Sequence, residues 1–272
     1  MKPRAWNPFT FKGVAAFSWS GWIRLWVAQW LAALLLGGSF YMTLTKAWGP
    51  VLHEALRNLP DEPGIASLEN RNLHWSNLKS PEILAGNEFL SLVVDPQDHP
   101  ALPGAASDVR VVFRKNHMEV RAALLGQIDI SYHEEWNLNL TREDVFAWWG
   151  AWGVGWVVGM IAGGLILLWT TWMALGLFYT PPGWALAYFW DRDTGPFGSW
   201  RLATASLLPG GIFLGLAFTA YGLGWIPWLV LWGAFLAHWG IGWVYWIGAI
   251  RRIPYLKYAA EEHGNPFALT AR

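Results

Sequence analysis

The sequence predicts a polytopic α-helical membrane protein with four transmembrane helices and a small, mainly β extracytoplasmic domain inserted between helices 1 and 2. Charged residues make up only 14% of the 272 residues, against about 25% in an average soluble domain. Several apolar runs are long enough to cross a bilayer about 30 Å thick. Residues 45–144 interrupt these runs with short segments rich in Val, Ile and aromatic residues, a composition typical of strands.

The predicted chain has five consecutive parts, of which the second contains helix 1 and the fourth contains helices 2–4. The first apolar run is longer than a signal-peptide h-region and no small-residue cleavage site follows it, so we interpret it as an uncleaved signal anchor. We expect Pro181 and Pro182 to end helix 2, and the short segment after helix 3 to form a tight hairpin with helix 4. The predicted parts are a cytoplasmic segment at 1–21, transmembrane helix 1 at 22–44, the extracytoplasmic domain at 45–144, helices 2–4 within 145–250 (about 146–178, 202–223 and 225–250) and a cytoplasmic tail at 251–272.

The placement of Lys and Arg predicts the orientation of the chain. Residues 1–24, 180–201 and 251–272 together carry ten basic and four acidic residues, whereas residues 46–144 carry nine basic and fifteen acidic ones. Because basic flanks stay on the cytoplasmic side, we expect both termini in the cytoplasm and residues 45–144 outside.

Within the extracytoplasmic domain, alternating apolar residues predict strands at 89–94, 108–113, 118–124 and 127–132. Residues 114–117 suit a hairpin turn, and residues 49–60 form an amphipathic helical pattern. The chain has no cysteine, so no disulfide supports a domain of this marginal size. We therefore expect the extracytoplasmic domain to be stabilised by contact with the membrane surface, a protein partner or a second copy.

Composition and motifs limit the activities that the sequence predicts. A net charge of zero gives no reason to expect nucleic-acid binding. The chain has no G-x-S-x-G elbow, H-E-x-x-H motif or Walker loop, so we assign no catalytic residue. We also expect no cofactor and no metal.

The segment "DPQDHP" brings Asp95, Asp98 and His99 close together in the sequence. Clustered carboxylates and histidine are metal-ligand types, but the prolines favour an ordinary turn. His238 is the one titratable group well inside a span. It could take part in a proton relay or contact a ligand, although a neutral histidine bonded to a neighbouring helix is the favoured interpretation.

Tryptophan is frequent where helix 2 is expected to enter the membrane from the outside. Trp148, Trp149 and Trp152 fall at the predicted membrane–water boundary, where indole rings concentrate. We therefore interpret them as interface anchors and not as a ligand cage.

Small residues recur along the predicted spans. Gly155, Gly159 and Gly163 repeat every fourth residue, which predicts a groove for close helix packing. Gly211 and Gly215 suggest the same role in helix 3, and we expect Gly159→Leu to destabilise the bundle or its assembly.

The order of elements resembles the bacterial integral membrane family known as domain-of-unknown-function family 1189, which is related to the Yip-type clan. The similar segments are "NLPDEPGI" followed by "LHW", "FLSLVVDP" with Asp95, "DVRVVFRKNHMEV", "DISYHEEWNLNLT" and "PGGIFLGLAF". The resemblance implies a multi-pass protein of the bacterial inner membrane with no established activity, and it transfers no catalytic residue.

These observations favour a non-catalytic membrane protein. It would be a scaffold, a sensor or an assembly or regulatory factor that acts through its outer domain and helix bundle. Its expected partners are membrane lipids and either another protein or a second copy, with no nucleic acid. The first alternative is a transporter or permease subunit, with His238 and a Pro209 kink lining the path. The second is a membrane enzyme with an outer-surface metal site at Asp95, Asp98 or His99.

Overall fold

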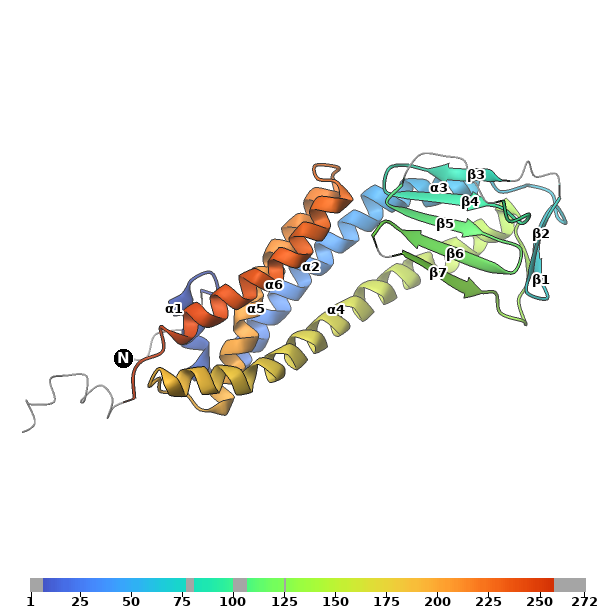
Figure 1. Cartoon of the computed structure of the whole chain (residues 1–272). Coiled ribbons are helices and arrows are strands. Elements are labelled where there is room, and N and C mark those ends of the chain that lie inside the picture. Colours follow the sequence, from blue (N-terminus) through green and yellow to red (C-terminus); the bar gives the residue numbers. More distant parts are fainter. Residues whose placement is uncertain (1–6, 77–80, 100–106, 125, 257–272) are drawn as a thin grey trace, which may run out of the picture. The chain divides into compact units, whose positions relative to one another are not determined.

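The computed structural model describes residues 7–76, 81–99, 107–124 and 126–256, whose course is drawn in Figure 1. In chain order the elements are α1 (Phe11–Ala16), α2 (Trp22–Thr43), α3 (Gly49–Arg57), β1 (Ala66–Glu69), β2 (Asn72–Trp75), β3 (Glu82–Gly86), β4 (Leu90–Val94), β5 (Val109–Phe113), β6 (His117–Ala122), β7 (Gly126–Ser131), β8 (Asn137–Asn139), α4 (Arg142–Phe189), α5 (Pro196–Gly222) and α6 (Trp228–Ile250), with a 3-10 turn at Phe17–Trp19 and a π-helical turn at Leu44–Trp48.

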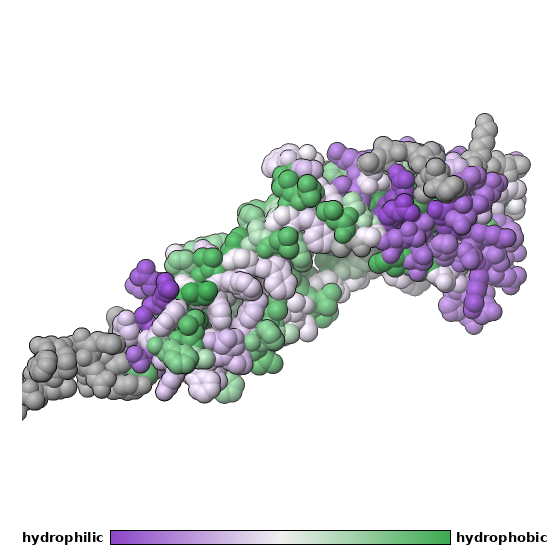
Figure 2. All heavy atoms as spheres, viewed as in Figure 1, coloured by the Kyte–Doolittle hydropathy of each residue, from purple (hydrophilic) through white to green (hydrophobic). Residues whose placement is uncertain are grey.

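The chain forms two compact units. The helical unit comprises residues 1–40, 161–220 and 229–272, and the sheet unit comprises residues 41–160 and 221–228. The helices α2, α4, α5 and α6 are each long and apolar enough to cross a membrane. Figure 2 shows hydrophobic surface over the long helices and hydrophilic surface over the sheets. Four long apolar helices with a sheet region between the first and second of them confirm the coarse fold class.

Helix α4 is longer than the sequence predicts at both ends. At its start, the backbone N–H of Asp144 bonds to the Thr141 hydroxyl (3.2 Å), which donates in turn to the Asp144 carboxylate (2.8 Å). This N-cap begins the helix at Arg142.

The expectation that Pro181 and Pro182 end this helix is wrong, because α4 continues through both to Phe189. One face of the turns after the prolines is packed: Gly183 lies against the indole of Trp246, and Ala187 is fully buried. Tertiary packing therefore overrides the local preference of proline to stop a helix.

The helical unit is held by small residues at close helix contacts and by arginine side chains, among them Arg201. A Cβ at Gly211 would meet the ring of Trp172, and one at Gly215 would meet Leu35 and Leu36, so both predicted packing glycines do pack. The Arg201 guanidinium donates to the backbone oxygens of Ser18 (2.7 Å) and Ser20 (2.6 Å). This joins the start of α5 to the turn before α2.

The predicted groove of Gly155, Gly159 and Gly163 has no such neighbours. A Cβ at any of the three would meet no atom of the described chain within 4 Å. This stretch of α4 is largely exposed, so the role of these three glycines in helix packing or assembly stays a prediction.

The sheet unit contains a five-stranded sheet in the order β3-β4-β5-β6-β7, with β4 and β5 parallel and the other pairs antiparallel. A second, three-stranded antiparallel sheet has the order β2-β1-β8. The predicted strands correspond to β4–β7, and the predicted amphipathic helix to α3. The sequence prediction missed β1, β2, β3 and β8. The β1–β2 turn uses left-handed residues, Asn70 and Arg71, at φ 47° and 63°, as a type I′ hairpin requires.

The tip of the α5–α6 hairpin belongs to the sheet unit. The Tyr221 hydroxyl donates to the Asp108 carboxylate (2.7 Å), and the Trp228 indole N–H donates to the Ala123 backbone oxygen (2.7 Å). Tyr221 also packs edge-on against Phe89. These contacts attach the tip to the ends of β5 and β6.

Gly210→Leu is expected to destabilise the helical unit, because a Cβ at Gly210 would meet the backbone oxygen of His238 in α6. Overpacking of this kind costs about 1–3 kcal/mol. The matched control is Gly240→Leu, where a Cβ would meet nothing within 4 Å and helix propensity improves. The thermal unfolding midpoint in mild detergent should fall by several degrees for Gly210→Leu alone. Equal shifts for the two variants would contradict this account of the α5–α6 contact.

Candidate functional site

The sheet unit contains an apolar cavity of about 360 Å³. One wall is the apolar face of α3 and the turn after it, where Leu52, Ala55, Leu56 and Leu59 recur at helical spacing. Polar residues occupy the opposite face of α3, and His53, Glu54 and Arg57 are exposed. The amphipathic pattern thus turns a continuous hydrocarbon surface toward the cavity.

The sheets supply a second wall. Leu92 and Val94 are two residues apart on β4 and therefore point to the same face of the sheet. Phe113 pairs with Val94 across the β4–β5 ladder and extends that face. Leu73 and Trp75 add apolar surface from β2.

Helix α4 supplies the third wall with its first apolar turns. Val145, Trp148 and Trp149 are at helical i, i+3 and i+4 positions and all line the cavity. Gly153, one turn further on, lies directly against the Trp149 indole, so that a Cβ there would collide with the ring. Trp148 and Trp149 therefore form part of a cavity wall, which the anchor interpretation did not foresee. Trp152 does not line this cavity and is 62% exposed.

Hydrogen bonds at both ends of α3 hold it over the sheet. The Asn87 side-chain amide donates to the backbone oxygen of Ala47, in the turn before α3 (2.7 Å). The Asn58 amide, at the other end, donates to the backbone oxygen of Leu84 in β3 (2.6 Å). The backbone N–H of Arg142 donates to the oxygen of Pro60 (2.8 Å), which ties the segment after α3 to the start of α4.

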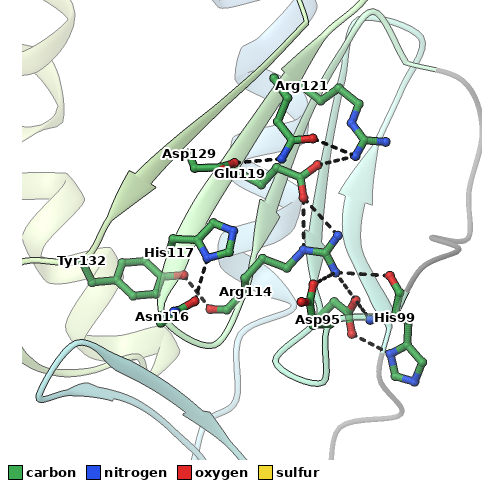
Figure 3. Close-up of polar contacts among 11 residues, drawn as sticks. Asp95, His99, Arg114, Asn116, His117, Glu119, Arg121, Asp129 and Tyr132 are labelled. Carbon is green, nitrogen blue, oxygen red and sulfur yellow. Dashed lines mark hydrogen bonds and ion pairs between the residues drawn. The ribbon is translucent and has the colours of Figure 1, made fainter.

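A buried ion-pair network lies in the same unit around Arg114, the residue after β5 (Figure 3). Its guanidinium contacts Asp95 at 2.5 Å, Asp98 at 3.1 Å and Glu119 at 3.0 Å. Asp95 is fully buried and Glu119 is 3% exposed, whereas Asp98 is exposed. Arg121 contacts the other oxygen of Glu119 at 2.7 Å. Each buried carboxylate thus has a cationic partner, as burial of charge requires.

The structure brings the predicted candidates Asp95, Asp98 and His99 together, but around a cation supplied by the chain itself. Asp95 accepts bonds from the His99 backbone N–H and pairs with its ring Nδ1, both at 2.7 Å. Arg114 occupies the position between Asp95 and Asp98. Within the described ranges, no group of three or more His, Asp or Glu residues could hold a metal ion. The arrangement favours the turn interpretation, with a structural role.

Tyr132 completes the network from the strand side. Its hydroxyl donates to the backbone oxygen of Arg114 (3.0 Å). Burial raises the pKa of Tyr132 well above its ordinary value, so the residue stays a neutral donor.

The side chain of His238 bonds within its own helix and not to a neighbouring one. Its ring Nδ1 bonds the backbone oxygen of Phe235, and the ring packs against Phe235 and Trp239. The expected hydrogen bond to a neighbouring helix is therefore wrong. What comes close to α5 is the His238 backbone oxygen, at Gly210.

Gln29 of α2 is among the buried polar residues that the sequence analysis does not single out. Its side chain is fully buried, and neither amide atom has a hydrogen-bond partner among the described residues. A single glutamine inside "WVAQWLAAL" was the available signal, because polar groups are costly inside apolar spans.

No protein-family model, curated protein or solved structure matches this chain. The class of protein therefore rests on the fold and the cavity. Four apolar helices fit a membrane protein, and the sheet unit contains an apolar cavity. The resemblance to the family of unknown function and to the Yip-type clan stays a prediction.

Arg114→Ala is expected to destabilise the sheet unit by about 3–5 kcal/mol, because it removes the guanidinium from the fully buried Asp95 and leaves the buried Glu119 with Arg121 alone. The matched control is Arg71→Ala, which breaks an exposed pair with Glu134 and should cost less than about 1 kcal/mol. Chemical denaturation followed by tryptophan fluorescence measures both. Similar costs for the two variants would show that the Arg114 network is not a structural support.

Proposed function

We propose that this chain is a non-catalytic integral membrane protein whose sheet unit binds an apolar ligand, so that it acts as a membrane-bound sensor or scaffold. The observation that carries the proposal is the apolar cavity between α3, the sheets and the start of α4. Its volume of about 360 Å³ falls in the range of about 300–1,000 Å³ typical of ligand sites. Every side chain that lines it is apolar, and none is an acid, a base or a nucleophile. Such a cavity can hold a ligand but supplies no group for chemistry.

The proposed location is the bacterial inner membrane, with several passes, both termini in the cytoplasm and residues 45–144 outside. The support is the distribution of Lys and Arg along the chain. Membrane lipids would cover the apolar surfaces of the long helices (Figure 2).

Connections along the chain support a sensor role. Helix α3 follows α2 after only the π-helical turn Leu44–Trp48. The third wall of the cavity is the beginning of α4, which continues as one helix to Phe189. A ligand that changes the spacing of α3 and α4 would therefore act directly on two of the long helices.

A surface for a protein partner or a second copy is available on β7. This strand is the edge of the five-stranded sheet, and all six of its residues are exposed. Ile128 and Ile130 lie on one face of it, 65% and 46% exposed. Exposed edge strands are templates for pairing with another chain.

Ligand binding can be tested with a small apolar diazirine, such as a trifluoromethyl phenyldiazirine, on the full chain in lipid nanodiscs. After photolysis, mass spectrometry locates the adducts. Wild-type protein should carry adducts on residues 82–94, which include the cavity-lining Leu84, Leu92 and Val94. Leu56→Trp adds bulk from the α3 wall and should lower this labelling at least about tenfold.

The matched control is Leu138→Trp, which makes the same substitution at a 45% exposed site of β8 outside the cavity. It should leave the labelling of 82–94 unchanged. Ala55→Phe fills the cavity from another position, and circular dichroism establishes that each variant is folded. Labelling that is absent in the wild type, or that survives both filling substitutions in folded protein, would refute ligand binding in this cavity.

A further inference from the structure

We infer that the cavity of the sheet unit binds one acyl chain of a membrane lipid. The inference rests on the proposed function, and it specifies the ligand and the side from which it enters.

The chemistry of the lining selects hydrocarbon. All the cavity walls are aliphatic or aromatic, so a polar ligand atom placed inside would lose its hydration without a compensating hydrogen bond. The buried part of the ligand must therefore be apolar throughout, and any charged or polar headgroup must stay outside the cavity.

The extent of the lining suits a chain. The α3 wall comprises Leu52, Ala55 and Leu56, which span about 6 Å along a helix at 1.5 Å per residue, and the turn after the helix adds Leu59. The aromatic rings of Trp75, Trp148 and Phe113 complete the walls. A lining of this kind fits a methylene chain better than a polar molecule.

The position of the walls in the sequence selects the bilayer as the source. Arg142, Glu143 and Asp144 are the last charged residues before the apolar run of α4, and Val145 and Trp148, directly after them, line the cavity. Tryptophan concentrates at the membrane–water boundary. A lipid whose headgroup remains at that boundary could place one chain along α4 and into the cavity without exposing it to water.

The experiment uses a phospholipid with a diazirine at the end of one acyl chain, added at a few per cent to nanodiscs that contain the full-length protein. We expect chain-end adducts on residues 82–94 in the wild type, a decrease of at least about tenfold in Leu56→Trp, and no change in Leu138→Trp. Adducts on Leu229 and Leu236, which are 68% and 69% exposed on α6, report bulk lipid in every sample. These adducts normalise the comparison.

Two further arms separate the possible failures. If the small apolar diazirine labels residues 82–94 but the phospholipid does not, ligand binding stands and the lipid inference is overturned. If a free fatty acid with the same diazirine labels them and the phospholipid does not, the source is a free fatty acid and the inference is again overturned. If no probe labels them, the proposed function fails as well. Phospholipid adducts that persist in folded Leu56→Trp and Ala55→Phe would lie outside the cavity and would also overturn the inference.

Discussion

The attachment of α3 at both of its ends is the constraint on which the sheet unit depends. Asn87 bonds the turn before the helix, and Asn58 bonds β3 from the residue after it. Val51 and Ala55 of α3 and Leu59 after it pack into the same buried cluster as residues of β3 and β4. The rest of this apolar face lines the cavity, with α4 on the third side. The polar contacts at both ends fix the helix in this position over the sheet.

The buried charges around Arg114 also stabilise the sheet unit, at the ends of its strands. Arg114 joins the end of β5 to Asp95, directly after β4, and to Glu119 of β6. The pairing of β4 with β5 is the one parallel pair in the five-stranded sheet, and parallel strands need a long connection between them. An ion pair that spans the ends of these strands offsets part of the conformational entropy that is lost when this long connection is closed. The same network engages the carboxylates that, in the sequence, suggest a metal site.

Much of the fold could be predicted from local patterns. Alternation identified β4–β7, and the spacing of Leu52, Leu56 and Leu59 identified α3. Strands β1, β2 and β8 have only three or four residues each, several of them polar, so alternation could not identify them. The end of α4 was misplaced because the packing of Gly183 against Trp246 outweighs two prolines.

The candidate site was less predictable, for a physical reason. Asp95, Asp98 and His99 are neighbours in the sequence, but their cation, Arg114, is distant and has no local signal. The sequence predicts Trp148 and Trp149 as interface anchors, together with Trp152, because the cavity that the first two line depends on residues up to about a hundred positions away. The position of α3 over the sheet depends on two side-chain amides, each of which bonds a backbone oxygen 26 or 40 residues away in the sequence.

Native mass spectrometry of the full-length protein released from lipid nanodiscs tests most directly whether this cavity holds a lipid chain. The account predicts that wild-type protein and Leu138→Trp retain one phospholipid more than Leu56→Trp under the same activation energy. Identical numbers of retained lipids in the three proteins would contradict it.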